Sequence, residues 1–314
     1  MDTFTKDRFL GTAVARRSFL RGSALTAAGL TGAALLGGTP VFPREQGFGK
    51  DDGGWDGDDK NSDTAQEIFT AALIAEGLAT TMYYNSLVGG VIQDPNLAGP
   101  GGSLTNPASL ANVGYLQGAL SEEIAHANLL RELIGGTTVG KDPVQTFYFP
   151  TGTFDTLANF LPILLALENA FIGAYLTAVH EFSLMAAKLE PYEREQRDPS
   201  GKPYRRKDLA YFSQVAASIM GVESEHRTLA RALPGISVGN TVFAGIDVFP
   251  ADNLNYEQTD GLKSVYNGAN SAVAALTPFI TAGAGKTAFS YATAISGSSG
   301  VSVPTTGGLP VEIG

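Results

Sequence analysis

Apolar residues recur with a helical period in four long segments of the chain. Positions three and four residues apart lie on one face of a helix, so each segment is typical of a helix that buries that face. The first two segments stop at Gly89-Gly90 and Gly135-Gly136, where a helix C-terminus is expected. The predicted helices cover residues 64–88, 108–134, 155–189 and 207–232. Together they predict an all-α fold built on a four-helix bundle.

The segments outside these helices divide the chain further. Residues 45–63 are rich in glycine and aspartate and predict a solvated linker. Residues 135–153 lack a helical period and form one long crossover between the second and third helices. We expect residues 233–314 to be a C-terminal extension, with one further helix over 253–281 and an irregular tail from Gly283 onwards.

The N-terminal 44 residues read as a targeting segment. Residues 15–21, ARRSFLR, precede the uncharged, Gly/Ala-rich run of residues 22–38 and resemble a bacterial twin-arginine export signal. A frayed basic N-terminus and a signal anchor are the alternatives. The cleavage position between Gly38 and Arg44 stays open. We expect an exported protein of the periplasm, cell envelope or extracellular space.

Composition narrows the classes of partner and cofactor. The formal net charge of −10 opposes nucleic-acid binding. The chain has no cysteine, which excludes disulfides and thiolate metal sites. The apolar run 161–179 is almost long enough to span a bilayer, but it carries Glu168 near its centre, where a carboxylate in lipid is costly. We therefore predict a buried helix and no stable membrane span after removal of the signal.

Glutamate and histidine recur in the same order in both halves of the predicted bundle. In each half a single glutamate lies in an apolar helix, and a Glu-x-x-His pair follows on the next helix. Residues three apart share one helix face, so both members of each pair can bind the same metal ions. The first half contributes Glu76, Glu123 and His126, and the second contributes Glu168, Glu223 and His226.

Four carboxylates and two imidazoles suit two iron or manganese ions. Four buried glutamates would repel one another, and two divalent cations would cancel their charge. The sequence therefore predicts six metal ligands and two Fe or Mn ions per chain. The alternative is that these residues are independent surface or core features.

Two tyrosines fit the same arrangement. Tyr83 follows Glu76 by seven residues and Tyr175 follows Glu168 by seven, so each shares the face of its glutamate about 10 Å along the axis. We expect each hydroxyl to support a ligand carboxylate from another helix, with ordinary core tyrosines as the alternative. His180, Glu122 and Glu225 are not predicted ligands; the two glutamates are expected to be solvated or to support the ligands.

The order of the six glutamate and histidine ligands and the long crossover resemble the ferritin-like superfamily of di-metal carboxylate proteins over residues 64–232. With the export signal, the chain is similar to exported bacterial ferritin-like proteins of the desiccation-related type. The resemblance implies the six ligands above, with no catalytic residue beyond them.

It also implies a redox-active centre that acts on peroxide, oxygen or Fe(II) in stress protection, as a catalase, peroxidase or ferroxidase. The alternative is a non-enzymatic, metal-stabilised envelope or desiccation-protection protein. Homo-oligomerisation stays open.

Overall fold

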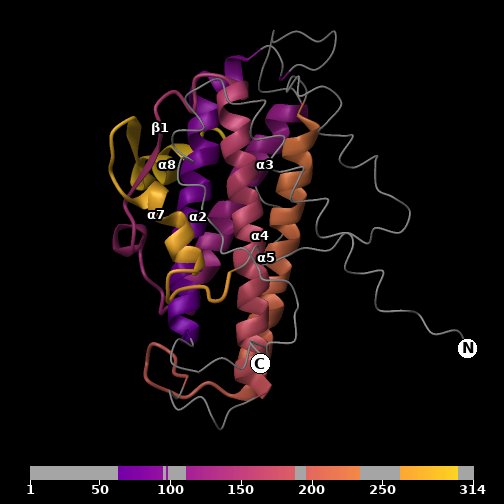
Figure 1. Cartoon of the computed structure of the whole chain (residues 1–314), viewed down its shortest axis with the longest axis vertical. Coiled ribbons are helices and arrows are strands. Elements are labelled where there is room, and N and C mark those ends of the chain that lie inside the picture. Colours follow the sequence, from indigo (N-terminus) through magenta and orange to yellow (C-terminus); the bar gives the residue numbers. More distant parts are fainter. Residues whose placement is uncertain (1–62, 95–96, 98–110, 188–195, 234–261, 303–314) are drawn as a thin grey trace, which may run out of the picture. The chain divides into compact units, whose positions relative to one another are not determined.

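The computed structural model describes residues 63–94, 97, 111–187, 196–233 and 262–302. The N-terminal segment and almost all of the predicted linker lie outside these ranges. Within them, α2 packs against α3 and α4, and α5 packs against α3 and α4 (Figure 1). The predicted all-α four-helix bundle is confirmed. Its helices are α2 (Ala65–Val88), α3 (Ala111–Leu133), α4 (Leu157–Ala187) and α5 (Arg206–Ala232).

Local chemistry fixes where these helices begin and end. Thr64 caps α2 with its side chain, and Glu67 accepts a hydrogen bond from the Thr64 backbone N–H at 2.7 Å, so two free N–H groups are satisfied. After α3, Gly135 and Gly136 adopt φ values of 104° and 71°. The N–H of Gly136 donates to the carbonyl of Arg131, which ends the helix as the sequence predicts.

The crossover from α3 to α4 is anchored by a buried ion pair. It contains the short helix η6 (Val139–Lys141) and the strand β1 (Thr146–Pro150). Arg131 on α3 donates from Nε and Nη2 to the Asp142 carboxylate, and Nη2 also donates to Tyr291. Because Arg131 and Asp142 are both buried, each requires the other as a partner.

The predicted C-terminal helix is shorter than expected. Residues 253–261 lie outside the described ranges, and residues 262–271 form turns instead of helix, so α7 spans only Ala272–Ile280. Backbone N–H groups of Val265, Tyr266 and Asn267 donate to the Asp63 carboxylate, and a helix would redirect them. Asp63, predicted to lie in a solvated linker, is instead buried at 1% exposure.

The predicted irregular tail contains regular structure. Strand β2 (Lys286–Ser290) pairs antiparallel with β1, with Tyr148 opposite Ala288, and helix α8 (Tyr291–Ser298) packs on α2. β1, α7 and α8 all lie on one side of α2 (Figure 1). Gly77 permits this approach, because a Cβ there would lie 3.2 Å from Phe147 and 3.6 Å from Tyr291.

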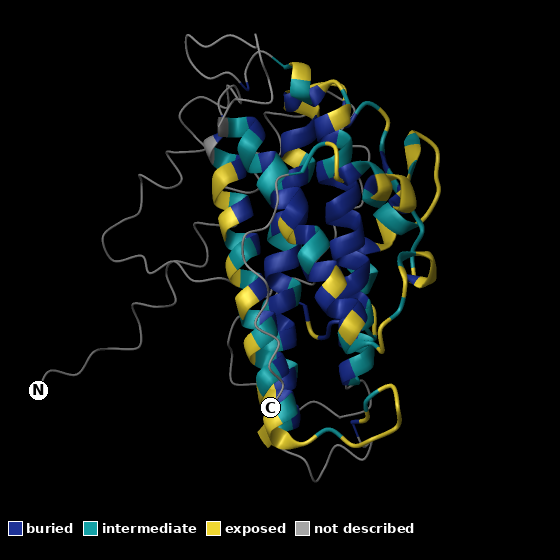
Figure 2. Cartoon of the chain, turned by 180° about the vertical axis from the view of Figure 1, so that it is seen from behind, coloured by how far each residue is buried: buried dark blue, intermediate teal, exposed yellow. Residues whose placement is uncertain are grey.

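The core forms two apolar clusters, one toward each end of the bundle. The buried inner faces of the helices are visible in Figure 2. On α2, residues up to Leu73 pack in one cluster and residues from Ile74 pack in the other. On α3 the change of cluster falls between Leu120 and Ala127, and on α5 between Ile219 and Ala230. The buried glutamates and histidines of these helices lie at this boundary.

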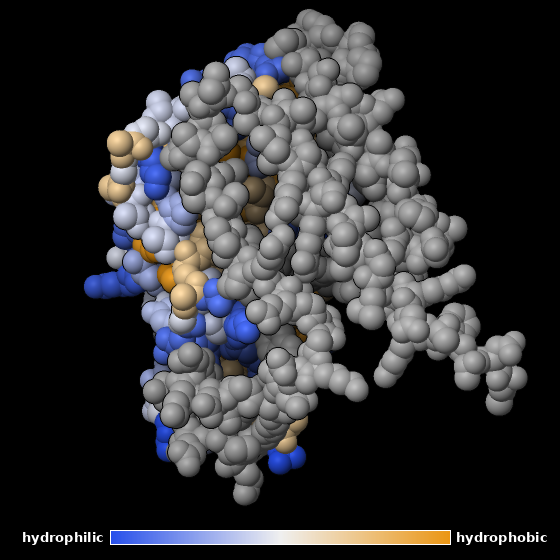
Figure 3. Space-filling view, viewed as in Figure 1, coloured by the Kyte–Doolittle hydropathy of each residue, from blue (hydrophilic) through white to orange (hydrophobic). Residues whose placement is uncertain are grey.

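The described surface is mostly hydrophilic on the face drawn in Figure 3, with small separate apolar patches. Among the described residues, the exposed large hydrophobic side chains are Val88 and Leu229. Helix α4 is long and apolar enough to cross a membrane by length and composition, with a mean hydropathy of 1.6 over its most apolar window, but half of that window is buried in the protein.

Candidate metal centre

The structure brings all six candidate ligands together inside the bundle. Each helix contributes to the cluster, and each of the six residues is at least 94% buried. The ligand atoms fall into two overlapping groups, within which all atoms lie within 4.8 Å of one another. The groups are Glu76, Glu123, His126 and Glu223, and Glu123, Glu168, Glu223 and His226.

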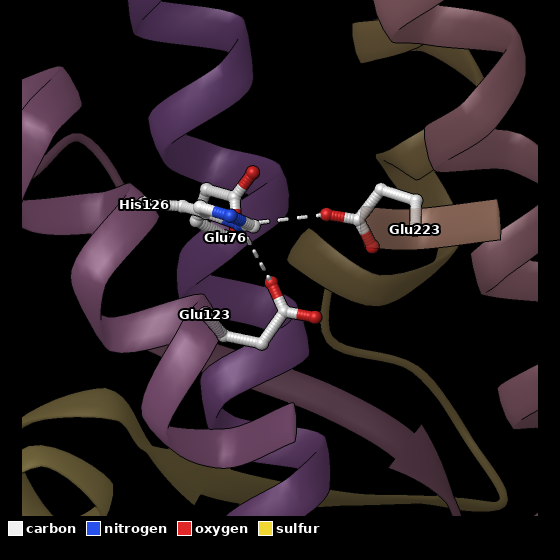
Figure 4. A group of neighbouring side chains, drawn as sticks. All are labelled: Glu76, Glu123, His126 and Glu223. Atoms are coloured by element: carbon white, nitrogen blue, oxygen red, sulfur yellow. Dashed lines mark ion pairs between the residues drawn. The ribbon is translucent and has the colours of Figure 1, made fainter. Parts of the chain in front are cut away.

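The first group converges on the Nδ1 atom of His126. This atom lies 3.3 Å from Glu76 Oε2, 3.8 Å from Glu123 Oε2 and 3.6 Å from Glu223 Oε1. Figure 4 shows the four side chains pointing toward one another. They come from α2, α3 and α5, so a cation held here would tie three helices together.

The second group places His226 in the equivalent position. Its Nδ1 lies 3.1 Å from Glu123 Oε1 and 3.5 Å from Glu223 Oε2. Glu123 and Glu223 therefore belong to both groups, with one carboxylate oxygen of each turned to each histidine. Carboxylates in this position can bridge two cations, while Glu76 and Glu168 can each bind one.

Eight ligand atoms in this cluster are buried without a hydrogen bond. They are the Oε2 atoms of Glu76 and Glu168, both carboxylate oxygens of Glu123 and Glu223, and Nδ1 of His126 and His226. A buried polar atom without a partner costs about 1–3 kcal/mol, and more when charged. Two divalent cations would satisfy all eight atoms and neutralise four carboxylates. The donor set therefore fits a di-metal centre.

The electrostatics of the protein atoms alone point the same way. Burial, and then the neighbouring Glu123 charge, raise the pKa of Glu76 well above its usual value. Burial and the Glu223 charge do the same to the pKa of Glu168. Burial opposes ionisation of Glu123, but the nearby imidazole nitrogens of His126 and His226 outweigh it and lower the Glu123 pKa. Protons on Glu76 and Glu168 would thus offset part of the negative charge of the cluster.

The histidines respond to the same acidic surroundings. Burial alone would lower the pKa of His126, but the charge of Glu76 and the nearby carboxylate of Glu123 raise it well above its usual value. For His226 the glutamates at 122 and 123 outweigh burial and raise the pKa similarly. Metal binding here would have to displace these protons.

The two tyrosines each contact a glutamate of the opposite helix. Tyr83 on α2 donates to Glu168 Oε1 on α4 at 2.5 Å, and Tyr175 on α4 donates to Glu76 on α2. Both rings are buried, and burial raises the pKa of both phenols well above the usual value. They therefore stay protonated and keep donating to the carboxylates.

Two further residues support the second group. The half-exposed Glu122 lies 2.7 Å from His226 Nε2, which orients the ring with Nδ1 toward the ligands. Tyr115 contacts the Tyr83 hydroxyl at 3.0 Å and donates to the His226 carbonyl. The role of Tyr115 could not be predicted from the sequence, because no tyrosine occupies the matching position in the second half of the bundle. His180 and the exposed Glu225 belong to neither group.

Comparison with known proteins identifies part of this bundle. Residues 64–189 match the model of the family described as Ferritin-like domain. No curated protein and no solved structure matches the chain. The matched range contains α2, α3 and α4, and α5 beyond it supplies Glu223 and His226. Residues 64–189 are thus similar to a ferritin-like domain, and α5 completes an all-α four-helix bundle whose buried carboxylate and histidine groups could hold metal ions.

Proposed function

We propose that this chain is an exported di-metal protein whose centre holds two iron or manganese ions and reacts with peroxide, dioxygen or Fe(II) in protection against stress. The observation that carries the proposal is the set of eight buried ligand atoms without hydrogen bonds. Iron or manganese bound to these atoms would supply one-electron redox chemistry, since both metals change oxidation state in oxygen-rich ligand sets.

The residues of the chain would have distinct roles around such a centre. Glu123 and Glu223 would contribute to holding both ions, because each has one carboxylate oxygen near each histidine. Tyr83 holds the Glu168 carboxylate, and Tyr175 holds the Glu76 carboxylate, each by a hydrogen bond from the opposite helix. The apolar clusters on both sides exclude water from the ligands, which strengthens the attraction between carboxylates and cations.

The supply of electrons would be external. A chain without cysteine has no thiolate-bound iron centre of its own, so the electrons would come from a soluble reductant, from Fe(II), or, in dismutation, from a second molecule of peroxide. Export is supported by residues 15–21, which lie outside the described structure. Cell fractionation tests it: the mature protein should leave the cytoplasm, and replacement of Arg16 and Arg17 by lysine should retain it there.

Oxidant consumption by the iron-loaded full chain tests the reaction. Wild type should consume peroxide or dioxygen, and Glu168→Gln should lose most of this activity, because the amide cannot balance the metal charge. Glu225→Gln is the matched control, since Glu225 is exposed and belongs to neither ligand group. Equal rates in all three proteins at equal metal content would support a metal-stabilised scaffold and contradict a redox enzyme.

A further inference from the structure

A small apolar cavity lies inside the bundle beside the candidate metal centre. All four bundle helices contribute to its wall, and the centre of a water-sized molecule has about 10 Å³ of space within it. Its lining residues are all buried except Val215, which is partly exposed on α5. The cavity thus holds about one small molecule and approaches the surface on the α5 side.

The sequence spacing places this cavity one helical turn from the ligands. Ala72, Leu130 and Ile219 in its wall are each four residues from a ligand on the same helix. Four residues advance an α-helix by about 6 Å and return to nearly the same face. The corresponding ligands are Glu76, His126 and Glu223, which all belong to the first ligand group.

Tyr175 separates the cavity from this group. Its ring lines the cavity, while its hydroxyl donates to Glu76. It contributes the one polar side chain among the lining residues, and that hydroxyl is already occupied by the carboxylate. A molecule bound in the cavity would therefore make only apolar contacts with the wall.

The apolar wall of the cavity determines which small molecule can bind in it. A buried water makes about two to four hydrogen bonds, and cavities that cannot provide them stay dry and accept apolar guests. Hydrogen peroxide carries two hydroxyl groups, and burying a hydroxyl without a hydrogen-bond partner is unfavourable. Dioxygen has neither requirement and is small enough for this space.

We propose that this cavity binds dioxygen and holds it one turn from the metal centre. The proposal rests on the proposed function, and it narrows the oxidant from peroxide or dioxygen to dioxygen. The cavity concentrates dioxygen beside Glu76, His126 and Glu223 and leaves Tyr175 as the barrier between the guest and the ligands.

Crystals of the full chain pressurised with krypton, whose diameter is close to that of dioxygen, test the binding site directly. Ala216→Leu places a larger side chain into the cavity from α5. Ala217→Leu is the matched control, because its neighbouring position on α5 is not part of the wall. If Ala216→Leu does not fold, Ala178→Val enters the same cavity from α4.

The expected result is krypton density in the cavity of wild type and Ala217→Leu, and none in Ala216→Leu. In the iron-loaded proteins, the rate at which dioxygen is consumed at limiting dioxygen should fall several-fold in Ala216→Leu alone. Iron content and the peroxide-driven rate should match between the two variants.

Absence of krypton from wild type, or equal dioxygen-driven rates in the two variants, overturns the dioxygen site. Failure of wild type to take up iron overturns the proposed function instead, and the krypton density then decides by itself whether the cavity binds a small apolar gas.

Discussion

The hydroxyl of Tyr175 on α4 donates a hydrogen bond to Glu76 on α2, a residue 99 positions earlier in the chain. The reverse contact joins Tyr83 on α2 to Glu168 on α4. Each tyrosine therefore follows one glutamate by seven residues and binds the other. This exchange requires α2 and α4 to run in opposite directions, so that two turns upward on one helix match two turns downward on the other.

Removal of either hydroxyl should weaken metal binding. Tyr175→Phe leaves the ring in place and frees the Glu76 carboxylate, so we expect metal affinity to fall by about 10–100-fold, the range found when such supporting contacts are lost. Isothermal titration with Mn²⁺ measures the effect. Tyr211→Phe, which removes a hydroxyl from a partly buried ring on α5 outside the ligand groups, is the control. Equal losses in both variants would contradict a supporting role for Tyr175.

Metal affinity should rise steeply with pH. Without metal, burial and neighbouring carboxylates raise the pKa values of Glu76 and Glu168, and the surrounding glutamates outweigh burial to raise the pKa values of His126 and His226. These protons must leave when a cation binds, so binding should release protons and weaken as pH falls. Titrations in two buffers of different ionisation enthalpy count the protons released. A pH-independent affinity would show that the cations bind elsewhere.

Glu181 should make the fold less stable at alkaline pH. Its carboxylate accepts from the Val265 N–H, and burial together with the nearby charges of Asp63 and Glu67 raises its pKa to about 9. The folded state thus keeps a proton that the unfolded chain loses near the usual value, and stability falls as pH rises between the two values.

Glu181→Gln carries a neutral group at every pH and should remove this decline. We expect wild type and variant to unfold at similar temperatures at about pH 5. At about pH 8 the free energy of unfolding of the variant should be higher by on the order of 1–3 kcal/mol. Glu225→Gln at the exposed surface serves as the reference. If both variants follow the wild-type curve, Glu181 ionises in the folded state without cost.

The bundle and the six ligand positions could be predicted from the sequence because both depend on local spacing. A Glu-x-x-His pair shares one helix face wherever the helix lies, and the apolar period identifies the helices. Gly135 and Gly136 end α3 through their own positive φ angles, a property that a sequence carries locally.

The features that escaped prediction depend on contacts between distant segments. β1 and β2 are short and pair across about 140 residues, so neither strand carries a period of its own. In the sequence, Asp63 is the last acid of the Asp-rich run 45–63, and only the fold brings its carboxylate to the backbone of residues 265–267. The start of α7 follows from that contact, since the N–H groups that bind Asp63 are withdrawn from a helix.

The metal content of the full chain, purified from its native export route, tests the central claim most directly. Because there are two overlapping ligand groups, we predict about two iron or manganese ions per chain by elemental analysis. His226→Ala should lower this content and the unfolding temperature together, because binding energy here is also folding energy. Less than about half an equivalent of metal in wild-type protein of normal stability would contradict a di-metal centre.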